Sequence, residues 1–441
     1  MKIFDYRKFK KSNLSTIIDG NYVGEYENLI VRIIKENIED YKEVIKKTRS
    51  FAELIESEIF YEDENVLVLK HKKLRYITYP IEWTEKQKIE AICSVIDLQR
   101  KLDEIGYHLK DPHAFNITYE KSNPIYLDFG SITKGRFNTG KWIKHRLLLP
   151  NQRDCWDYFL NINRYEQWWI LIRISISHKP LIILKHLLLK HIEKGNKLLK
   201  YTSRIKPFFE FSKKIKILRY SLNYINNIFF KDAKSRITNW TYYQQNNTVI
   251  SSNNSRKNNF ILLLNKYKPN LILDIGANKG AYSKLALKYG VKEAICIDVD
   301  SYSLDILREE IKNNNLHIWT ARMDIMNYNE KPGHYESYLA AHLRFRSKFV
   351  ICFAIIHHLC YFGSYSFEQF AETIEKFAEY ILIVEFVPYS DIHLNGPYYK
   401  GKDKLWYTQE NFIVAMKKYF KKAIEIFDST PNPRVLIKFE K

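Results

Sequence analysis

The chain has 441 residues, of which 46% are hydrophobic and 27% charged, and its formal net charge is +20. These values are typical of a globular protein and exclude a fibrous chain or one disordered over most of its length. No apolar run reaches the roughly 18 residues that span a bilayer, and the basic N-terminus lacks the apolar stretch of a signal peptide. The five scattered cysteines indicate neither a disulfide framework nor a thiolate zinc site. We therefore expect a cytoplasmic protein of two to three domains.

The first clear elements lie between residues 59 and 130. Two β-like runs, IFYEDENVLVLKHK and LRYITYP, end at Pro80. Apolar residues at steps of three or four then predict a helix from Thr84 to about Gly106. A polar loop, 107–116, leads into a predicted β-hairpin made of NITYE and IYLDFG.

The loop and the hairpin carry a spacing that resembles protein kinases. Asp111 is followed five residues later by Asn116, and the sequence Asp128-Phe-Gly comes about a dozen residues further on. Kinases place their catalytic aspartate, a metal-binding asparagine and a second metal-binding aspartate in this order. The resemblance implies a kinase-like domain in which Asp111, Asn116 and Asp128 would hold Mg²⁺ and ATP if the domain were active.

Two departures from the kinase pattern favour a degenerate domain. Leu109 stands where kinases carry a histidine, and no G-x-G-x-x-G loop is present. Lys35 is the candidate for the lysine on the third strand, with Glu53 or Glu56 as its helix partner. We expect a substrate-binding or scaffold domain, with phosphoryl transfer as the alternative.

Residues 131–250 hold 23 basic and 6 acidic side chains, so this helical, aromatic segment carries nearly all of the excess positive charge. It predicts a basic helical lobe, whose charge is in the simplest case a solvated face. The alternative is contact with an anionic membrane leaflet or with a lipid-linked or phosphorylated acceptor. The polar stretch 244–259 has no periodicity and predicts a linker.

After this stretch, apolar runs alternate with amphipathic segments: LILDIG with AYSKLALKYG, AICIDVD with SLDILREEIKNN, and FVICFAII with FEQFAETIEKFAEY. The alternation predicts an α/β fold, a doubly wound parallel Rossmann-like sheet covered by helices. Two last runs, AIEIFDS and RVLIKFE, predict an antiparallel pair that closes the sheet. We expect a kinase-like domain over 1–245, of α+β type with the helical lobe, and the Rossmann-like domain over 246–441.

The first strand–helix turn of this domain runs from Asp274 to Gly280. Glycines at 276 and 280 let the backbone approach a ligand closely, and the following helix offers free N–H groups. Asp298 stands eighteen residues beyond Gly280, at the end of the next strand. A carboxylate there can accept both hydroxyls of a ribose, with Asp300 as the substitute. The order of strand, turn, helix, strand and acid predicts a nucleoside-containing cofactor.

The turn D-I-G-A-N-K-G resembles the first motif of class I S-adenosylmethionine-dependent methyltransferases, and CIDVD resembles their second motif. The resemblance extends over 258–441. It implies that S-adenosylmethionine is held by residues of the turn, the second strand end and the third strand end, which are Asp274, Gly276, Asn278, Gly280, Asp298 and Asp324.

His357 and His358 follow the apolar strand FVICFAII, at the strand end where such sheets bind ligands. Either imidazole is a candidate to remove the proton from a methyl acceptor, and Glu385 after the next strand is the third candidate. FAIIHHL and VEFVP resemble the corresponding segments of a methyltransferase subset with paired histidines. The segment lacks the Asn/Asp-Pro-Pro-aromatic and Pro-Cys motifs of base methylation, which argues against a nucleic acid as substrate.

The combination of GYHLKDPHAFNITY, PIYLDFGSI and a C-terminal methyltransferase resembles a family of bacterial methyltransferases related to a rhizobial host-specific nodulation protein. The resemblance implies O-methylation of a glycan or glycolipid precursor. Three alternatives remain open: a bifunctional kinase–methyltransferase that modifies a saccharide terminus, a non-catalytic binding protein built on a Rossmann scaffold, and RNA methylation driven by the basic segment.

Overall fold

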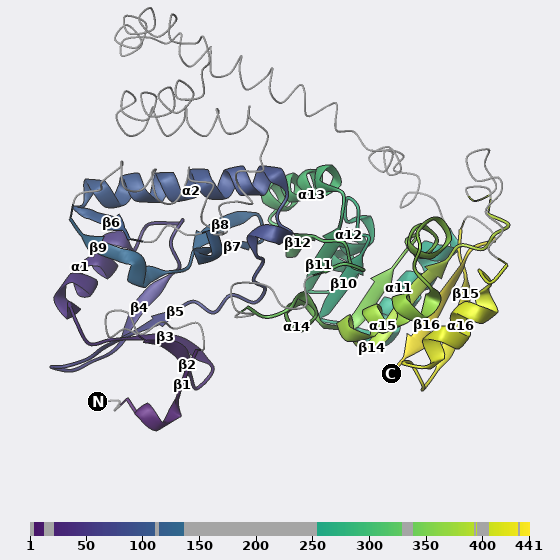
Figure 1. The fold of residues 1–441 in the computed structure, drawn as a ribbon, viewed down its shortest axis with the longest axis horizontal. Coiled ribbons are helices and arrows are strands. Elements are labelled where there is room, and N and C mark those ends of the chain that lie inside the picture. The colour runs from purple at the N-terminus through teal and green to yellow at the C-terminus, as the bar shows by residue number, and fades with distance from the viewer. Residues whose placement is uncertain are drawn as a thin grey trace, which may run out of the picture.

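The computed structural model describes residues 4–12, 22–110, 114–135, 254–328, 338–391, 394, 405–430 and 433–441. They form two units, an N-terminal unit up to residue 135 and a C-terminal unit from residue 254 (Figure 1). Most of the basic segment 131–250 and the predicted domain boundary at 245/246 lie outside these ranges. No helix within the ranges combines the length and the apolar character needed to cross a membrane.

An antiparallel sheet with the strand order β1-β2-β3-β5-β4 begins the N-terminal unit. Its strands are β1 (Phe9–Lys11), β2 (Tyr22–Tyr26), β3 (Leu29–Ile34), β4 (Ser57–Glu62) and β5 (Leu67–His71). Helix α1 (Ile38–Thr48) connects β3 to β4. The first β-like run therefore forms two strands, because Asp63 accepts the N–H groups of Asn65 and Val66 and reverses the chain between them.

The second β-like run, LRYITYP, is not a strand, and this prediction was wrong. Residues 72–79 form an extended connection, followed by the 3₁₀ turn η3 (Pro80–Glu82). The Tyr76 hydroxyl donates to Glu293 at 3.1 Å, and the Tyr76 ring meets Trp319 edge-on at a centroid distance of 4.9 Å. Tyr76 of this run therefore packs against the C-terminal unit and does not take part in a sheet.

The predicted helix after Pro80 is confirmed as α2 (Glu85–Glu104). Thr84 and Gln87 form a capping box, in which each side chain accepts the backbone N–H of the other residue. Beyond α2, β6 (Tyr107–Leu109) pairs with β9 (Ile132–Lys134), and β7 (Ile117–Glu120) pairs with β8 (Asn123–Tyr126) as the predicted hairpin. Fully buried Trp83, Tyr119 and Phe129 contribute to the core of this unit.

The C-terminal unit contains a seven-stranded sheet with the order β12-β11-β10-β13-β14-β16-β15. The strands are β10 (Leu271–Ile275), β11 (Glu293–Asp298), β12 (Ile318–Arg322), β13 (Ser347–Cys352), β14 (Ala378–Phe386), β15 (Ile424–Asp428) and β16 (Val435–Glu440). The first five strands in this spatial order are parallel, and β16 runs antiparallel to both of its neighbours, β14 and β15. The predicted doubly wound sheet with a closing antiparallel pair is confirmed, and its order reverses between β10 and β13, where such sheets bind ligands.

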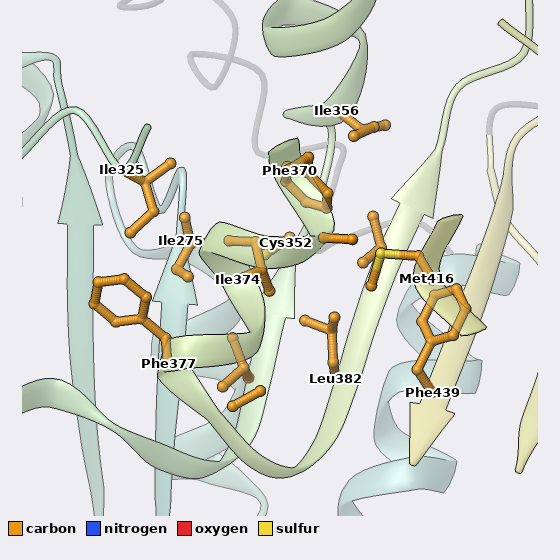
Figure 2. Close-up of a cluster of buried hydrophobic side chains, with 14 of the residues drawn as sticks. Ile275, Ile325, Cys352, Ile356, Phe370, Ile374, Phe377, Leu382, Met416 and Phe439 are labelled. Atoms are coloured by element: carbon orange, nitrogen blue, oxygen red, sulfur yellow. The ribbon is translucent and has the colours of Figure 1, made fainter. Parts of the chain in front are cut away.

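Helices cover both faces of this sheet. One face carries α11 (Ser255–Tyr267), α12 (Ala281–Lys288) and α13 (Ser301–Asn314), and the other carries α14 (Ala341–Phe345), α15 (Phe367–Phe377) and α16 (Gln409–Lys417). Figure 2 shows Phe370, Ile374 and Phe377 of α15 over the strand side chains Ile275 and Leu382. Because successive strand residues point to opposite faces, Ile272 packs on the other side, under α11 and α12.

The end of the predicted linker 244–259 is helical, which corrects that prediction. Helix α11 begins at Ser255, and the Asn254 side chain caps it by accepting the Lys257 N–H at 2.7 Å. The first turn of the helix has no apolar periodicity that could have predicted it, because its first five residues are polar and only Arg256 among them is buried.

Candidate active site

The glycine turn lies at the carboxyl end of β10, beside the end of β13. Gly276 has a φ of +76° and donates its N–H to Ile297 at 2.8 Å, which draws the turn against β11. A Cβ at Gly276 would lie 3.0 Å from Cδ1 of Ile355, and one at Gly280, φ +66°, would lie 2.9 Å from Leu307. Both glycines are therefore required by backbone conformation and by close packing.

Asp274 lies beneath this turn and is only 4% exposed. Its Oδ2 accepts a hydrogen bond from the Ser283 hydroxyl at 2.7 Å. Burial raises the pKa of Asp274 to about 7, and the negative charge of Asp298 acts in the same direction. Among the described residues, no lysine or arginine forms an ion pair with this carboxylate. The site therefore holds a buried acid whose ionised form a cation would stabilise.

Asp298 ends β11 and faces the same turn. Its Oδ2 accepts the Asn278 N–H at 2.7 Å and its Oδ1 accepts the Asp300 N–H at 2.8 Å. Burial raises the pKa of Asp298, although these backbone hydrogen bonds oppose the shift. Asp300, the predicted substitute, instead caps α13 by accepting from the N–H and the hydroxyl of Ser303. Asp298 is thus the better placed of the two acids for a ribose.

Asp324 follows β12, the next strand of the sheet, and is exposed. It holds its own loop by accepting from the Met326 N–H at 3.0 Å and the Asn327 amide at 2.6 Å. The Met323 N–H donates to the Asp298 carbonyl at 2.9 Å, so the two strand ends are adjacent. A pocket of about 230 Å³ opens there, lined by Ile81, Glu82, Val299, Arg322, Met323, Asp324, Asn327 and Tyr328.

The sequence interpretation missed Val299, Arg322, Ile81 and Glu82 of this pocket. Val299 directly follows Asp298 and is 56% exposed, so an apolar side chain lies uncovered next to this acid. Its position after the strand end was a signal that could have identified it. Ile81 and Glu82 belong to the N-terminal unit, and no local pattern connects them with the glycine turn.

His357 and His358 begin a short π-helical turn, His357–Phe362, after β13. Their ring centroids are 3.8 Å apart, and His357 is buried. Burial, together with the charge of Arg434, lowers the pKa of His358 to about 4. His358 is therefore a neutral imidazole near pH 7. Because Ile355 touches the position of Gly276, the histidine segment lies next to the glycine turn.

Glu385 is fully buried in β14, and this placement argues against its predicted role as a base. Both carboxylate oxygens accept from the same Arg256 nitrogen, at 2.9 and 2.8 Å, and the Ser429 hydroxyl donates at 2.7 Å. Arg434, which pairs with Asp391 at 2.7 Å, lies 3.8 Å from the same carboxylate. These groups form a buried charge network that connects α11, Ser429 and Arg434 to β14.

The structure describes only some of the residues with the predicted kinase-like spacing. Asp111 lies outside the described residues, and the Asn116 carbonyl accepts the Leu127 N–H at 2.6 Å, next to Asp128. Asp128 forms an ion pair with Arg32 on β3 at 2.7 Å. Arg32 lies on β3, whereas the predicted strand lysine, Lys35, follows the end of β3 and lies 6.0 Å from the Tyr22 ring centroid. Among the described residues, no group of three His, Cys, Asp or Glu side chains is arranged to hold a metal.

The helix partners suggested for the strand cation were also wrong. Glu53 and Glu56 lie beyond the end of α1, and Glu53 pairs with Lys101 of α2 at 2.6 Å. Helix α1 carries the acids Glu39, Asp40 and Glu43, of which Glu43 accepts from the Tyr107 hydroxyl at 2.8 Å.

No family model matches the sequence. The chain is 26% identical to the nodulation protein NoeA of Rhizobium meliloti (strain 1021) over 375 residues, which cover 79% of this chain and 77% of that protein. The solved N-methyltransferase NodS of Bradyrhizobium japonicum WM9 is similar at 14% identity, covering 45% of this chain and 98% of NodS, with a TM-score of 0.32. Its complex with S-adenosyl-L-homocysteine gives 12% identity, 49% and 98% coverage, and a TM-score of 0.32. The assignment of the fold rests on the strand order of the sheet itself.

Proposed function

We propose that the chain is an S-adenosylmethionine-dependent methyltransferase. The observation that carries this proposal is Asp274, a buried acid without a described cationic partner, beneath a glycine turn that ends a parallel strand. A ligand that joins a positive charge to a nucleoside would suit this acid and Asp298 together. S-adenosylmethionine combines these two properties, and the order of motifs in the sequence supports the same cofactor.

The residues of the site fit such a cofactor. The missing side chains at Gly276 and Gly280 leave the backbone of the turn open, and Asp298 keeps lone pairs on both oxygens for ribose hydroxyls. The pocket beside Asp324 has room for a flat base. When bound, the cofactor would supply an electrophilic methyl group. The protein's contribution is then largely to position the acceptor and to receive its proton.

The histidine pair is the proposed acceptor side of the site. Burial and the charge of Arg434 lower the pKa of His358, so its ring is neutral near pH 7 and the unprotonated ring nitrogen can accept a hydrogen bond from an acceptor hydroxyl. His357 touches the His358 ring and is more deeply buried, so we assign it the task of holding His358 in place. Glu385 acts further away, through the ion pair that anchors α11.

We propose a hydroxyl of a glycan or glycolipid precursor as the acceptor. The similarity to a nodulation protein over most of both chains supports this class, as does the lack of base-methylation motifs after β13. The net positive charge of residues 131–250 supports contact with an anionic membrane leaflet that carries such an acceptor.

We propose that the N-terminal unit is kinase-like but does not transfer phosphate. Kinases use a lysine on the third strand for ATP phosphates and keep the aspartate of Asp-Phe-Gly for Mg²⁺. Here Arg32 on β3 binds Asp128 directly, and a Cβ at Gly130 would lie 2.0 Å from the Arg32 guanidinium. The Arg32 guanidinium thus occupies the Asp128 carboxylate, which a kinase would keep available for Mg²⁺. This pairing favours a scaffold role for the N-terminal unit.

Titration calorimetry of the full chain with S-adenosylhomocysteine tests the proposed function. We expect saturable heat from the wild-type protein, and an affinity weaker by about tenfold or more in Asp298→Ala, because a charged hydrogen-bond acceptor is lost. Gly276→Arg should show no binding, since its side chain would enter the space of the turn and Ile355. The matched control is Asp428→Ala, an exposed aspartate at the end of β15. Absence of heat from the wild-type protein, or equal heat from all three variants, would contradict the proposal.

A further inference from the structure

The pocket beside Asp324 is formed by both halves of the molecule. Ile81 and Glu82 come from η3 of the N-terminal unit, and the remaining lining residues come from the ends of β11 and β12 in the C-terminal unit. Asp298 and Arg322 are direct neighbours in the β11–β12 register. A base joined to a ribose at Asp298 would therefore find this pocket next to it, a step that rests on the proposed function.

The pocket exposes apolar side chains to solvent on both sides. Val299 is 56% exposed and Ile81 is 37% exposed, while Met323 below them is 8% exposed. A flat aromatic ring between Val299 and Ile81 would bury apolar surface on both of its faces, which is favourable. Arg322 adds a planar guanidinium that can stack on an aromatic face.

The η3 segment is held firmly against the C-terminal unit. Glu82 and Arg344 of α14 form a two-pronged ion pair that is almost fully buried, with one bond of 3.0 Å. Arg344 also donates to the Ile77 carbonyl and stacks over the Tyr79 ring, at 4.2 Å from its centroid. A paired guanidinium and carboxylate fix orientation as well as distance. Ile81 is therefore presented to the pocket by a rigid support.

The start of α2, which directly follows η3, is held against α13, the helix after Asp298. The Thr84 hydroxyl donates to Asp305 at 2.6 Å, and Arg308 donates to Glu90 at 2.6 Å. Figure 1 shows one end of α2 beside α13. Helix α13 begins just after Asp298 and also contacts Thr84 and Glu90 of the N-terminal unit. The same helix therefore supports both Asp298 and the N-terminal side of the pocket.

We propose that residues 79–83 of the N-terminal unit complete the adenine end of the cofactor pocket, with Ile81 contacting the base and the Glu82–Arg344 ion pair holding Ile81 in position. Cofactor binding then requires a residue of the kinase-like unit, and the two units form one binding site. Glu82 is a positioning residue, since its carboxylate is occupied by Arg344 and by the Tyr79 N–H at 2.9 Å.

Calorimetry of the full chain with S-adenosylhomocysteine and with adenosine tests this proposal. We expect Ile81→Asp to weaken both ligands by about tenfold, because a charge replaces apolar contact with the base. Ile81→Leu should bind close to wild type. The matched control is Ile59→Asp on β4, where an isoleucine of similar exposure, 41%, lies away from the pocket. Melting temperatures of the ligand-free variants should be similar, since both isoleucines are partly exposed.

The possible outcomes separate this proposal from the proposed function. If the wild-type protein binds S-adenosylhomocysteine and Ile81→Asp binds it equally well, the contribution of the N-terminal unit is overturned and the cofactor assignment stands. The same holds if Ile59→Asp loses as much affinity, or if Ile81→Asp affects S-adenosylhomocysteine but leaves adenosine unchanged. If the wild-type protein binds neither ligand, the proposed function fails, and this proposal fails with it.

Discussion

Asp128 and Asp274 each stand two residues before a glycine in their unit, but their surroundings differ. Asp128 is 30% exposed and paired with Arg32 at 2.7 Å. Asp274 is buried, accepts a hydrogen bond from the Ser283 hydroxyl, and forms no ion pair with any described residue. Burial raises its pKa to about 7. The N-terminal acid has its counter-charge inside the protein, whereas no described residue forms an ion pair with the C-terminal acid.

This difference indicates how the two halves have divided their roles. An internally paired acid contributes to the fold and offers little to a metal or a phosphate. A buried acid without a cation reduces stability when it ionises, and such groups gather at functional sites. We infer that the ionisable groups of the proposed binding site lie in the C-terminal unit, and that the N-terminal unit contributes apolar contact and support.

The largest expected effect comes from breaking the most buried internal pair, Arg256–Glu385. Arg256→Ala would leave the Glu385 carboxylate buried with only Ser429 and the more distant Arg434. We expect the free energy of unfolding to fall by about 3–5 kcal/mol, measured by urea denaturation. The control is Arg75→Ala, whose side chain is 67% exposed in its pair with Glu293 and should cost no more than about 1 kcal/mol. Equal stability of the two variants would show that the network is not structural.

A smaller effect is expected for Arg32→Ala in the N-terminal unit. Because Asp128 is partly solvated, loss of its partner should cost about 1–2 kcal/mol in the free energy of unfolding. Binding of S-adenosylhomocysteine should be unchanged, and Lys35→Ala serves as the control for stability. Calorimetry with millimolar Mg²⁺-ATP sharpens the comparison: we expect no heat from the wild-type chain. ATP binding that is lost in Asp128→Ala would restore the kinase reading.

The smallest effect concerns the protonation of Asp274. Its pKa is raised from 3.8 to about 7 in the folded chain, so the folded state binds the extra proton and stability decreases as pH rises from about 4 to 7. A cationic ligand favours the ionised form instead. Binding of S-adenosylmethionine should therefore tighten by up to about tenfold between pH 6 and pH 8, with release of a proton.

Asp274→Asn provides the control for this pH dependence. The amide keeps an acceptor for the Ser283 hydroxyl but cannot ionise. We expect weaker binding that no longer changes between pH 6 and 8. A variant that retains the wild-type pH profile would show that another group titrates, and the contrast with Asp128 would lose its meaning.

Local patterns predicted the C-terminal unit well. The alternation of apolar strands and amphipathic helices, the glycine turn and Asp298 are encoded within short windows, and the structure confirms the elements. The errors arose where a partner lies far along the chain. Glu385 meets Arg256 across 129 positions, and Arg32 meets Asp128 across 96.

The run LRYITYP shows the same limit in the N-terminal unit. Its apolar and polar residues alternate as in a strand, but the Tyr76 ring packs against Trp319 and its hydroxyl donates to Glu293, both in the other unit. The position of Ile81 in the pocket cannot be predicted from the neighbouring sequence either, because it depends on how the two folded units contact each other. Sequence periodicity reports which residues are buried and does not say against what.

The contacts of α13 bear on how this protein can be divided. Arg308 is 3% exposed because Glu90, Tyr119 and the Ser122 carbonyl surround its guanidinium. A fragment that begins at residue 254 would release this cation into water, uncover Trp319, and remove Ile81 from the pocket. The C-terminal unit is therefore not an independent module, and a foreign N-terminal unit would have to provide the same contacts with α13.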